Sequence, residues 1–297
     1  MSSELDLNKI IKLVLLDKYK TVIAFLFFSV LSVFYALSLP NEYTSKVVVS
    51  SNMDESKGAG ALGSLSGLAS MAGFSLGGDG MSPEVIKEAL SSNSFLGQFV
   101  VDQGIAPQIM AAESYNVGQA KFIYDGKLYD EKSNTWVREV DYPKQKEPSI
   151  QELSKKFKEN LSVGFDRKTK LISVSFTSFS PEFSKYVLDE LVKSFNLYMR
   201  ASSREEAAKT IKYLKNKLEV EPIVEVRVAL QQLLEEQLKK QAFSETRTDF
   251  ALKVLDNPLV PSEKSAPKRA IVCMAITLAG TLLFALIFLS FRVVRLS

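Results

Sequence analysis

The chain has 297 residues, of which 46% are hydrophobic and 24% are charged, and its net charge is only +3. It contains no histidine, which removes histidine-based acid–base, triad and metal chemistry, and its single cysteine leaves no internal disulfide. The small net charge argues against nucleic acid as a partner, because nucleic-acid binding needs a concentrated basic surface.

An uncharged apolar run occupies residues 21–39, behind a polar tail at residues 1–20. A helix of this length crosses the roughly 30 Å hydrocarbon core of a bilayer. The alternative is a cleaved signal peptide, since Ala36 and Ser38 loosely match the small-residue cleavage pattern. The run is longer than the apolar region of most signal peptides and its leader is long, so we predict an uncleaved first transmembrane helix.

Beyond the first span, Tyr43–Ser50 is rich in β-branched residues and predicts a strand in a membrane-proximal sheet. A glycine-rich loop at residues 58–80 follows and lacks the lysine and hydroxyl of a phosphate loop. It is either an ordinary surface loop or a segment whose apolar residues contact a neighbouring subunit or lipid. Its candidate residues are Gly67, Gly73, Gly77 and Gly78.

The next elements are short. Ser82-Pro83-Glu84 is a helix start signal, and a second helical stretch covers Phe95–Val101. Asp125-Gly126 predicts a turn that joins Phe122–Tyr124 and Lys127–Tyr129 into a hairpin.

Three aromatic residues, Tyr124, Trp136 and Tyr142, fit two interpretations. They could form a platform on which a sugar ring stacks, or they could pack within the domain. Packing is the commoner use of such residues, and we favour it.

A helix is predicted over Ser149–Leu161, followed by a hairpin of two alternating strands, Leu161–Phe165 and Leu171–Phe176. A start signal at Ser180-Pro181-Glu182 then opens a helix that no glycine or proline interrupts before Pro222. Such a helix is about 60 Å long. A second helix follows Pro222, and because a small domain cannot bury so long an apolar stripe, we expect self-association.

Residues 249–260 predict a strand that returns beside the first strand, and a proline-containing segment leads from it into the second span. That segment is either a plain linker or a stiff coupling between the exported domain and the membrane helix. The candidate coupling residues are Pro258, Pro261, Pro267, Lys268 and Arg269.

The second apolar run covers residues 270–291 and precedes a short tail at residues 292–297. Ala275, Ala279 and Gly280 are candidates for close helix packing in it, and Cys273 is a small apolar residue there. Before the first span there are four lysines against three acids, and after the second there are two arginines. This charge pattern predicts that both termini lie in the cytoplasm.

The order of these elements resembles the Wzz-type polysaccharide co-polymerases, which are chain-length determinants of lipopolysaccharide O-antigen. The proline-containing segment before the second span is the most specific part of the likeness. The residues that carry the likeness are Gly67–Phe74, Ala89–Phe95, Leu161–Phe176 with Ser180-Pro181-Glu182, Tyr198–Arg200, Ile211–Leu214, Val254–Pro261 and Pro267–Ala270.

The resemblance implies an α+β fold, with two transmembrane helices flanking a periplasmic domain at residues 40–269. That domain would comprise a membrane-proximal α/β base (40–180), a long helical hairpin (181–248) and a return strand with the proline-rich segment (249–269). The implied protein is a homo-oligomer of the bacterial inner membrane. It contacts membrane lipid, and lipid-linked polysaccharide is a candidate ligand.

The implied function is non-catalytic control of O-antigen chain length in lipopolysaccharide biosynthesis, beside a separate Wzy-type polymerase. No cofactor or metal is expected. We also expect no fused cytoplasmic kinase. The main alternative is a membrane adaptor that activates a separate tyrosine kinase in capsule or exopolysaccharide export. A two-span sensor ectodomain is a further alternative.

Overall fold

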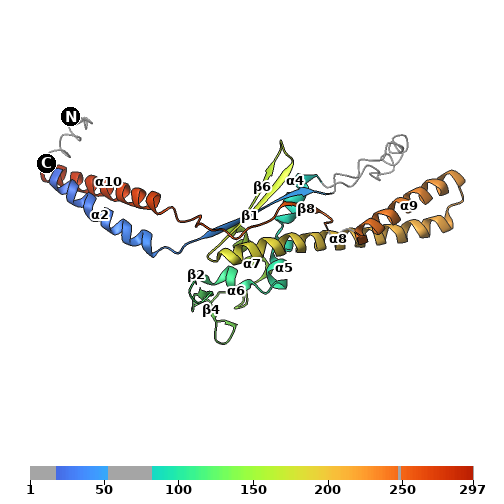
Figure 1. Ribbon diagram of the computed structural model, residues 1–297, viewed down its shortest axis with the longest axis horizontal. Helices are drawn as coiled ribbons and strands as arrows, with labels where there is room; N and C mark the ends of the chain where they lie inside the picture. The colour runs from blue at the N-terminus through green and yellow to red at the C-terminus, as the bar shows by residue number, and fades with distance from the viewer. Residues whose placement is uncertain (1–17, 53–81, 247–248, 297) are drawn as a thin grey trace. The chain divides into compact units, whose positions relative to one another are not determined.

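The computed structural model describes residues 18–52, 82–246 and 249–296 (Figure 1). The chain divides into two compact units, one of residues 1–43 and 263–297 and the other of residues 44–262. The predicted glycine-rich loop, with Gly67, Gly73, Gly77 and Gly78, lies outside the described residues, as does most of the N-terminal tail.

The first unit contains two long helices, α2 (Lys18–Ser38) and α10 (Arg269–Leu296), which lie side by side. Both are long and apolar enough to cross a membrane, over Tyr19–Ser38 and Arg269–Phe288. Only 17% and 6% of these stretches are buried in the structure, whereas a core helix of a soluble protein is mostly buried. The two apolar helices predicted from the sequence are confirmed.

The second unit is built on a four-stranded sheet in the order β6-β7-β1-β8. β6 and β7 form the predicted antiparallel hairpin, and β8 pairs antiparallel with β1, so the predicted return strand is also confirmed. The strands are β1 (Tyr43–Ser51), β6 (Leu161–Asp166), β7 (Leu171–Ser178) and β8 (Leu252–Asp256).

Serine side chains begin the helices that cover this sheet. Ser82, Ser92 and Ser180 each accept a hydrogen bond from the backbone N–H three residues later. Ser149 forms a reciprocal capping box with Glu152. The helices are α4 (Pro83–Leu90), α5 (Asn93–Asp102), α6 (Ala106–Met110), α7 (Ile150–Asn160), α8 (Pro181–Val220) and α9 (Val224–Thr246).

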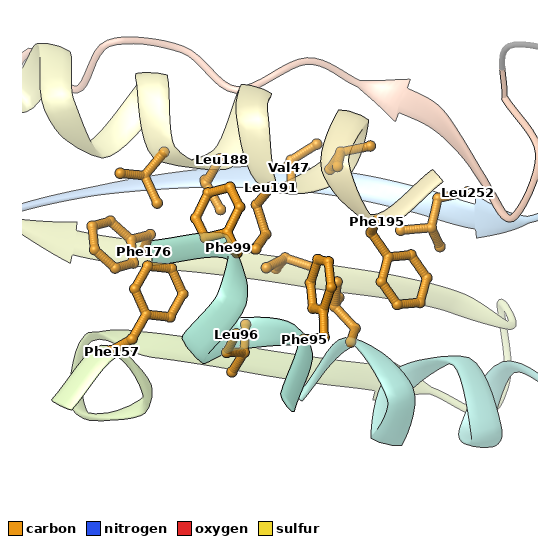
Figure 2. Close-up of a cluster of buried hydrophobic side chains, with 14 of the residues drawn as sticks. Val47, Phe95, Leu96, Phe99, Phe157, Phe176, Leu188, Leu191, Phe195 and Leu252 are labelled. Carbon is orange, nitrogen blue, oxygen red and sulfur yellow. The ribbon is translucent and has the colours of Figure 1, made fainter. Parts of the chain in front are cut away.

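The core lies between the sheet and helices α5, α7 and α8, and aromatic rings fill much of it (Figure 2). The Phe157 ring stacks on Phe176 of β7 with centroids 5.0 Å apart, and Phe95 meets Phe195 edge-on at 5.1 Å. Leu252 of β8 is fully buried in the same cluster. Burying such side chains stabilises each by about 1.5–3 kcal/mol, so this cluster holds the base together.

Helices α8 and α9 form the predicted long hairpin, joined at residues 221–223 around Pro222. The first half of α8 is buried against the base, but Ala207, Ile211 and Leu214 are its only buried residues beyond Met199. Several large apolar side chains of the hairpin stay exposed, most of them near its far end, namely Tyr213, Val220, Ile223, Val224, Val228 and Leu238. The α+β class with an apolar helix at each end and a long helical hairpin is therefore confirmed.

The predicted hairpin around Asp125-Gly126 is wrong. The turn exists, with Asp125 Oδ1 accepting from the Lys127 backbone N–H at 2.8 Å, but its two flanks do not pair with each other. The flank before the turn is β3 (Lys121–Tyr124), which pairs with β2 (Ala112–Asn116). The flank after it is β4 (Tyr129–Asp130), which pairs with β5 (Thr135–Trp136). The Asp125 N–H donates to the Ala111 carbonyl and so extends the β2–β3 pairing.

An ion pair between the buried Arg138 and the half-buried Glu152 holds the loop that follows these hairpins. The Arg138 guanidinium, 6% exposed, donates to both carboxylate oxygens of Glu152 at 2.8 and 3.0 Å. It also donates to the carbonyls of Gln145 and Lys146. The Arg138 hydrogen bonds are the main cause that lowers the pKa of Glu152 from its ordinary 4.5 to about 2.

Candidate coupling site at the ends of the apolar helices

The proline-containing segment is divided between the two units, and hydrogen bonds hold it within each of them. In the unit of residues 44–262, Pro258 is buried and Pro261 is half-buried. Neither proline has a backbone N–H, so the β1–β8 ladder cannot continue through them. The buried Ser45 hydroxyl instead donates to the Leu259 carbonyl at 2.8 Å, which keeps the chain beside β1 after β8 has ended.

In the other unit, Glu42 and residues 265–266 form a small backbone clamp between the end of α2 and the start of α10. The Glu42 N–H donates to the Ala266 carbonyl at 2.9 Å, and the Ser265 N–H donates to the Glu42 carbonyl at 2.8 Å. The Ser265 hydroxyl adds a third bond to the same Glu42 carbonyl at 3.1 Å. Pro267, whose bond to Ala266 is cis, follows this clamp directly and is half-buried.

Arg269, the first residue of α10, reaches the end of α2. Its Nη2 donates to Asn41 Oδ1 at 3.1 Å and to the Leu39 carbonyl at 3.4 Å. The carbonyls at a helix C-terminus lack partners within the helix, and a cation there also interacts favourably with the helix dipole. Lys268 is exposed, so of the two predicted basic residues the structure brings Arg269 into this contact.

Small and hydroxyl side chains form the contact between the two apolar helices. A Cβ placed on Gly280 would lie 2.5 Å from the Phe28 ring, so only glycine fits that close approach. The buried Ser32 and Thr277 hydroxyls lie 3.2 Å apart and share a hydrogen bond. The Cys273 thiol is 3.6 Å from the Ser32 carbonyl, within the length of a weak sulfur hydrogen bond.

Of the three small residues predicted for helix packing, the structure brings only Gly280 against α2. Ala275 and Ala279 lie on the exposed side of α10, because the contact stripe runs through Cys273, Thr277 and Gly280 at spacings of four and three. Sequence reasoning missed Ser32 and Thr277. Hydroxyl side chains within an apolar run are the signal that finds them, since such residues bond across membrane helices.

The three aromatic residues weighed as a sugar platform do not form one surface. Tyr142 is 96% exposed and stands apart, whereas Tyr124 and Trp136 both pack against Tyr129, with centroids 5.5 and 5.1 Å away. Tyr124 and Trp136 therefore both pack within the domain, while Tyr124, which is half-buried, keeps part of its side chain exposed. No metal site was expected, and residues 18–52, 82–246 and 249–296 hold no cluster of three His, Cys, Asp or Glu placed to bind one.

The family model described as "Wzz: Chain length determinant protein" matches residues 3–103, about a third of the 297-residue chain. A full-length bacterial polysaccharide co-polymerase is similar in structure, with 12% identity, a TM-score of 0.37 and coverage of 95% of this chain and 96% of that one. A fragment of WzzB, a polysaccharide co-polymerase from Salmonella Typhimurium, is similar with 12% identity, a TM-score of 0.31 and coverage of 76% of this chain and 100% of that one. Both TM-scores are too low for the likeness to carry an argument. No curated protein matches the sequence.

The N-terminal third of the chain therefore matches the Wzz chain-length-determinant family, and the resemblance to Wzz-type co-polymerases is confirmed. The matched residues include α2 and extend through β1, α4 and α5. The matched part of the chain thus runs from the first apolar helix through strand β1 to two of the helices that cover the sheet.

Proposed function

We propose that this chain is a non-catalytic, oligomeric regulator of the bacterial inner membrane that sets the length of O-antigen chains. A separate Wzy-type polymerase would form the glycosidic bonds. The observation that carries the proposal is the match of residues 3–103 to the chain-length-determinant family. The two apolar helices support it, because they provide a membrane anchor at each end of residues 44–262.

The proposed orientation places residues 40–269 in the periplasm and both termini in the cytoplasm. Long translocated domains are largely indifferent to their own charge, so the short basic flanks of the two spans decide this orientation. The polymer would then grow on the same side of the membrane as the α8–α9 hairpin.

Self-association is the role we propose for the far half of that hairpin. Its exposed apolar side chains, among them Val220, Ile223 and Val224, lack cover within the described chain. Contiguous exposed apolar residues favour contact with a partner, and a second copy of the same hairpin offers a complementary stripe.

The coupling of the exported domain to the polymerase is proposed for residues 257–269. The hydrogen bonds of Ser45, Glu42 and Arg269 support this role, because they hold the segment along the chain that leaves α2. A segment restrained in this way transmits a movement of the exported domain to the membrane helices, whereas a free linker would absorb it.

The proposal is tested by deleting the gene, restoring it, and separating the strain's lipopolysaccharide on a silver-stained gel. We expect the deletion to replace a modal cluster of bands with a smooth decay of short chains, and complementation to restore the cluster. A ladder that is unchanged by the deletion would contradict the proposal. If capsule or exopolysaccharide changed instead, the kinase-adaptor alternative would take its place.

A further inference from the structure

An open pocket lies over the two short hairpins of the unit of residues 44–262. Residues from β3, from β4 and from the turns around them line it, and it encloses about 380 Å³. That volume is within the range of pockets that bind small ligands. Of its lining residues only Tyr124 stands out in the sequence, because the pocket depends on the two hairpins lying together.

One wall of the pocket is aromatic and rigid. Tyr124 lies in this wall, half-buried, and packs against Phe122 and Tyr129 with centroids 6.3 and 5.5 Å away. Phe122 in turn meets Phe183 of α8 edge-on at 5.2 Å, which anchors the wall to the long helix. A ring held in this way loses little freedom when a ligand covers it.

Apart from Ile123 and Gly126, the rest of the lining is polar, with donors and acceptors of several kinds. Asn116 and Gln119 contribute amides, and Asp130 and Glu131 contribute carboxylates. The Lys132 N–H and the Ser133 hydroxyl hold the Asp130 carboxylate in place at 3.0 and 2.7 Å.

The charges of the lining cancel in number, because it contains Lys121 and Lys132 as well as Asp130 and Glu131. A phosphate or a nucleotide would need an excess of basic groups or a nest of backbone N–H donors. A neutral, polyhydroxylated ligand fits better: its C–H face covers an aromatic ring, while its hydroxyls both donate to carboxylates and accept from amides.

We propose that this pocket binds a saccharide unit of the polymer, with a sugar ring stacked on Tyr124 and its hydroxyls bonded to Gln119, Asp130 and Glu131. The inference rests on the proposed function, which places a growing polysaccharide beside this domain. It adds a direct contact between regulator and polymer. Through Phe122 and Phe183, an occupied pocket adjoins the first turn of α8.

The test uses the full chain in detergent micelles. The probe is the soluble polysaccharide released by mild acid from the lipopolysaccharide of the same organism. Saturation-transfer NMR detects the bound sugar, and calorimetric titration gives the Kd. The variants are Tyr124→Ala and Glu131→Ala, and the matched control is Tyr142→Ala, which removes an exposed tyrosine outside the pocket.

We expect saturable binding to the wild-type chain and to Tyr142→Ala, and Kd values about tenfold weaker for each pocket variant. Glu131 is exposed, so its replacement by alanine should leave the fold intact. Glu131→Ala therefore remains a valid test if Tyr124→Ala does not fold. Absence of saturable binding to the wild-type chain, or equal Kd values in Glu131→Ala and the control, would overturn the inference. The lipopolysaccharide gel separates the two proposals. If complementation restores the modal cluster but the chain binds no saccharide, the pocket proposal fails while the proposed function stands.

Discussion

Asn196 of α8 and Leu252 of β8 are hydrogen-bonded in both directions. The Asn196 side-chain amide donates to the Leu252 carbonyl at 2.9 Å, and Oδ1 of Asn196 accepts from the Leu252 N–H at 2.8 Å. The same oxygen accepts from the Ala251 N–H at 2.8 Å. One buried side chain thereby joins the long helix to the edge strand that leads into the proline-containing segment.

We expect Asn196→Ala to destabilise the protein by about 2–4 kcal/mol, because it leaves three buried backbone groups without their side-chain partner. Asn257→Ala, at an exposed position, is the matched control and is expected to change stability by less than about 0.5 kcal/mol. Denaturant unfolding of the two variants in the same detergent measures the difference. Equal unfolding free energies for the two variants would show that the Asn196 hydrogen bonds make no net contribution to stability.

The Arg138–Glu152 pair predicts a specific dependence of stability on pH. The folded-state pKa of Glu152 is lowered to about 2, so the pair's contribution is fully present above the unfolded value near 4.5. It is lost as the pH falls from 4.5 toward 2, because the unfolded chain then binds the proton first. We expect Glu152→Gln to be less stable than wild type at pH 7. The difference in unfolding free energy between the two proteins should become progressively smaller below pH 4.5.

The measurement for Glu152 is the free energy of unfolding of both proteins between pH 7 and pH 3. At neutral pH we expect the two unfolding free energies to differ by about 1–3 kcal/mol, as for a partly buried hydrogen bond between charged groups. If the difference between the two unfolding free energies stays constant across this pH range, Glu152 is not the cause of the pH dependence of stability.

Close packing between the apolar helices predicts a difference between two adjacent positions of α10. Gly280→Val forces side-chain atoms into the Phe28 ring, whereas Ala279→Val adds atoms on the exposed side. Overpacking of this kind costs about 1–3 kcal/mol. We therefore expect Gly280→Val, but not Ala279→Val, to lower the thermal unfolding midpoint in detergent. The reverse order would contradict the packing of α2 on α10 described above.

The contacts of Arg269 with the end of α2 predict that its substitution changes the length of the O-antigen chains rather than the insertion of the protein into the membrane. Arg269→Ala removes the bonds to Asn41 and Leu39, and Lys268→Ala, at the exposed neighbouring position, is its control. We expect the first variant to broaden the modal cluster on a lipopolysaccharide gel and the second to leave it unchanged. Immunoblots of membrane fractions verify that both variants are present at the wild-type level.

Substitution of the prolines within residues 257–269 also tests whether this segment couples the exported domain to the membrane helices. We expect alanine at Pro258, Pro261 or Pro267 to broaden the length distribution while the protein remains in the membrane. Pro258 is the buried one, so its variant is expected to have the largest effect. Unchanged ladders at normal protein levels would argue that residues 257–269 are a plain linker.

Elements with strong local signals were predicted well from the sequence. Ser82 and Ser180 precede prolines and acids that mark a helix start, and the alternation in Leu171–Phe176 indicates a strand with one buried face. The missed pairing of β3 with β2 has a physical reason. A strand of four residues has too little periodicity to select its partner, and the extra bond from Asp125 to Ala111 depends on how the chain has already folded.

The candidate site was predictable only in part. Proline and arginine before an apolar run are visible in the sequence, and so is Gly280 within it. Which face of α10 meets α2 depends on the register of two helices far apart in the chain, so Ala275 and Ala279 could not be separated from Gly280. The bonds of Glu42 with Ser265 are likewise long-range and leave no local pattern.

Polymerisation with purified components tests the central claim most directly. The polymerase and its lipid-linked repeat unit are incubated in proteoliposomes with and without this chain, and the products are separated by length. The account predicts a modal cluster when the chain is present, a smooth decay when it is absent, and no polymer from the chain alone. Identical decays with and without the chain would contradict it.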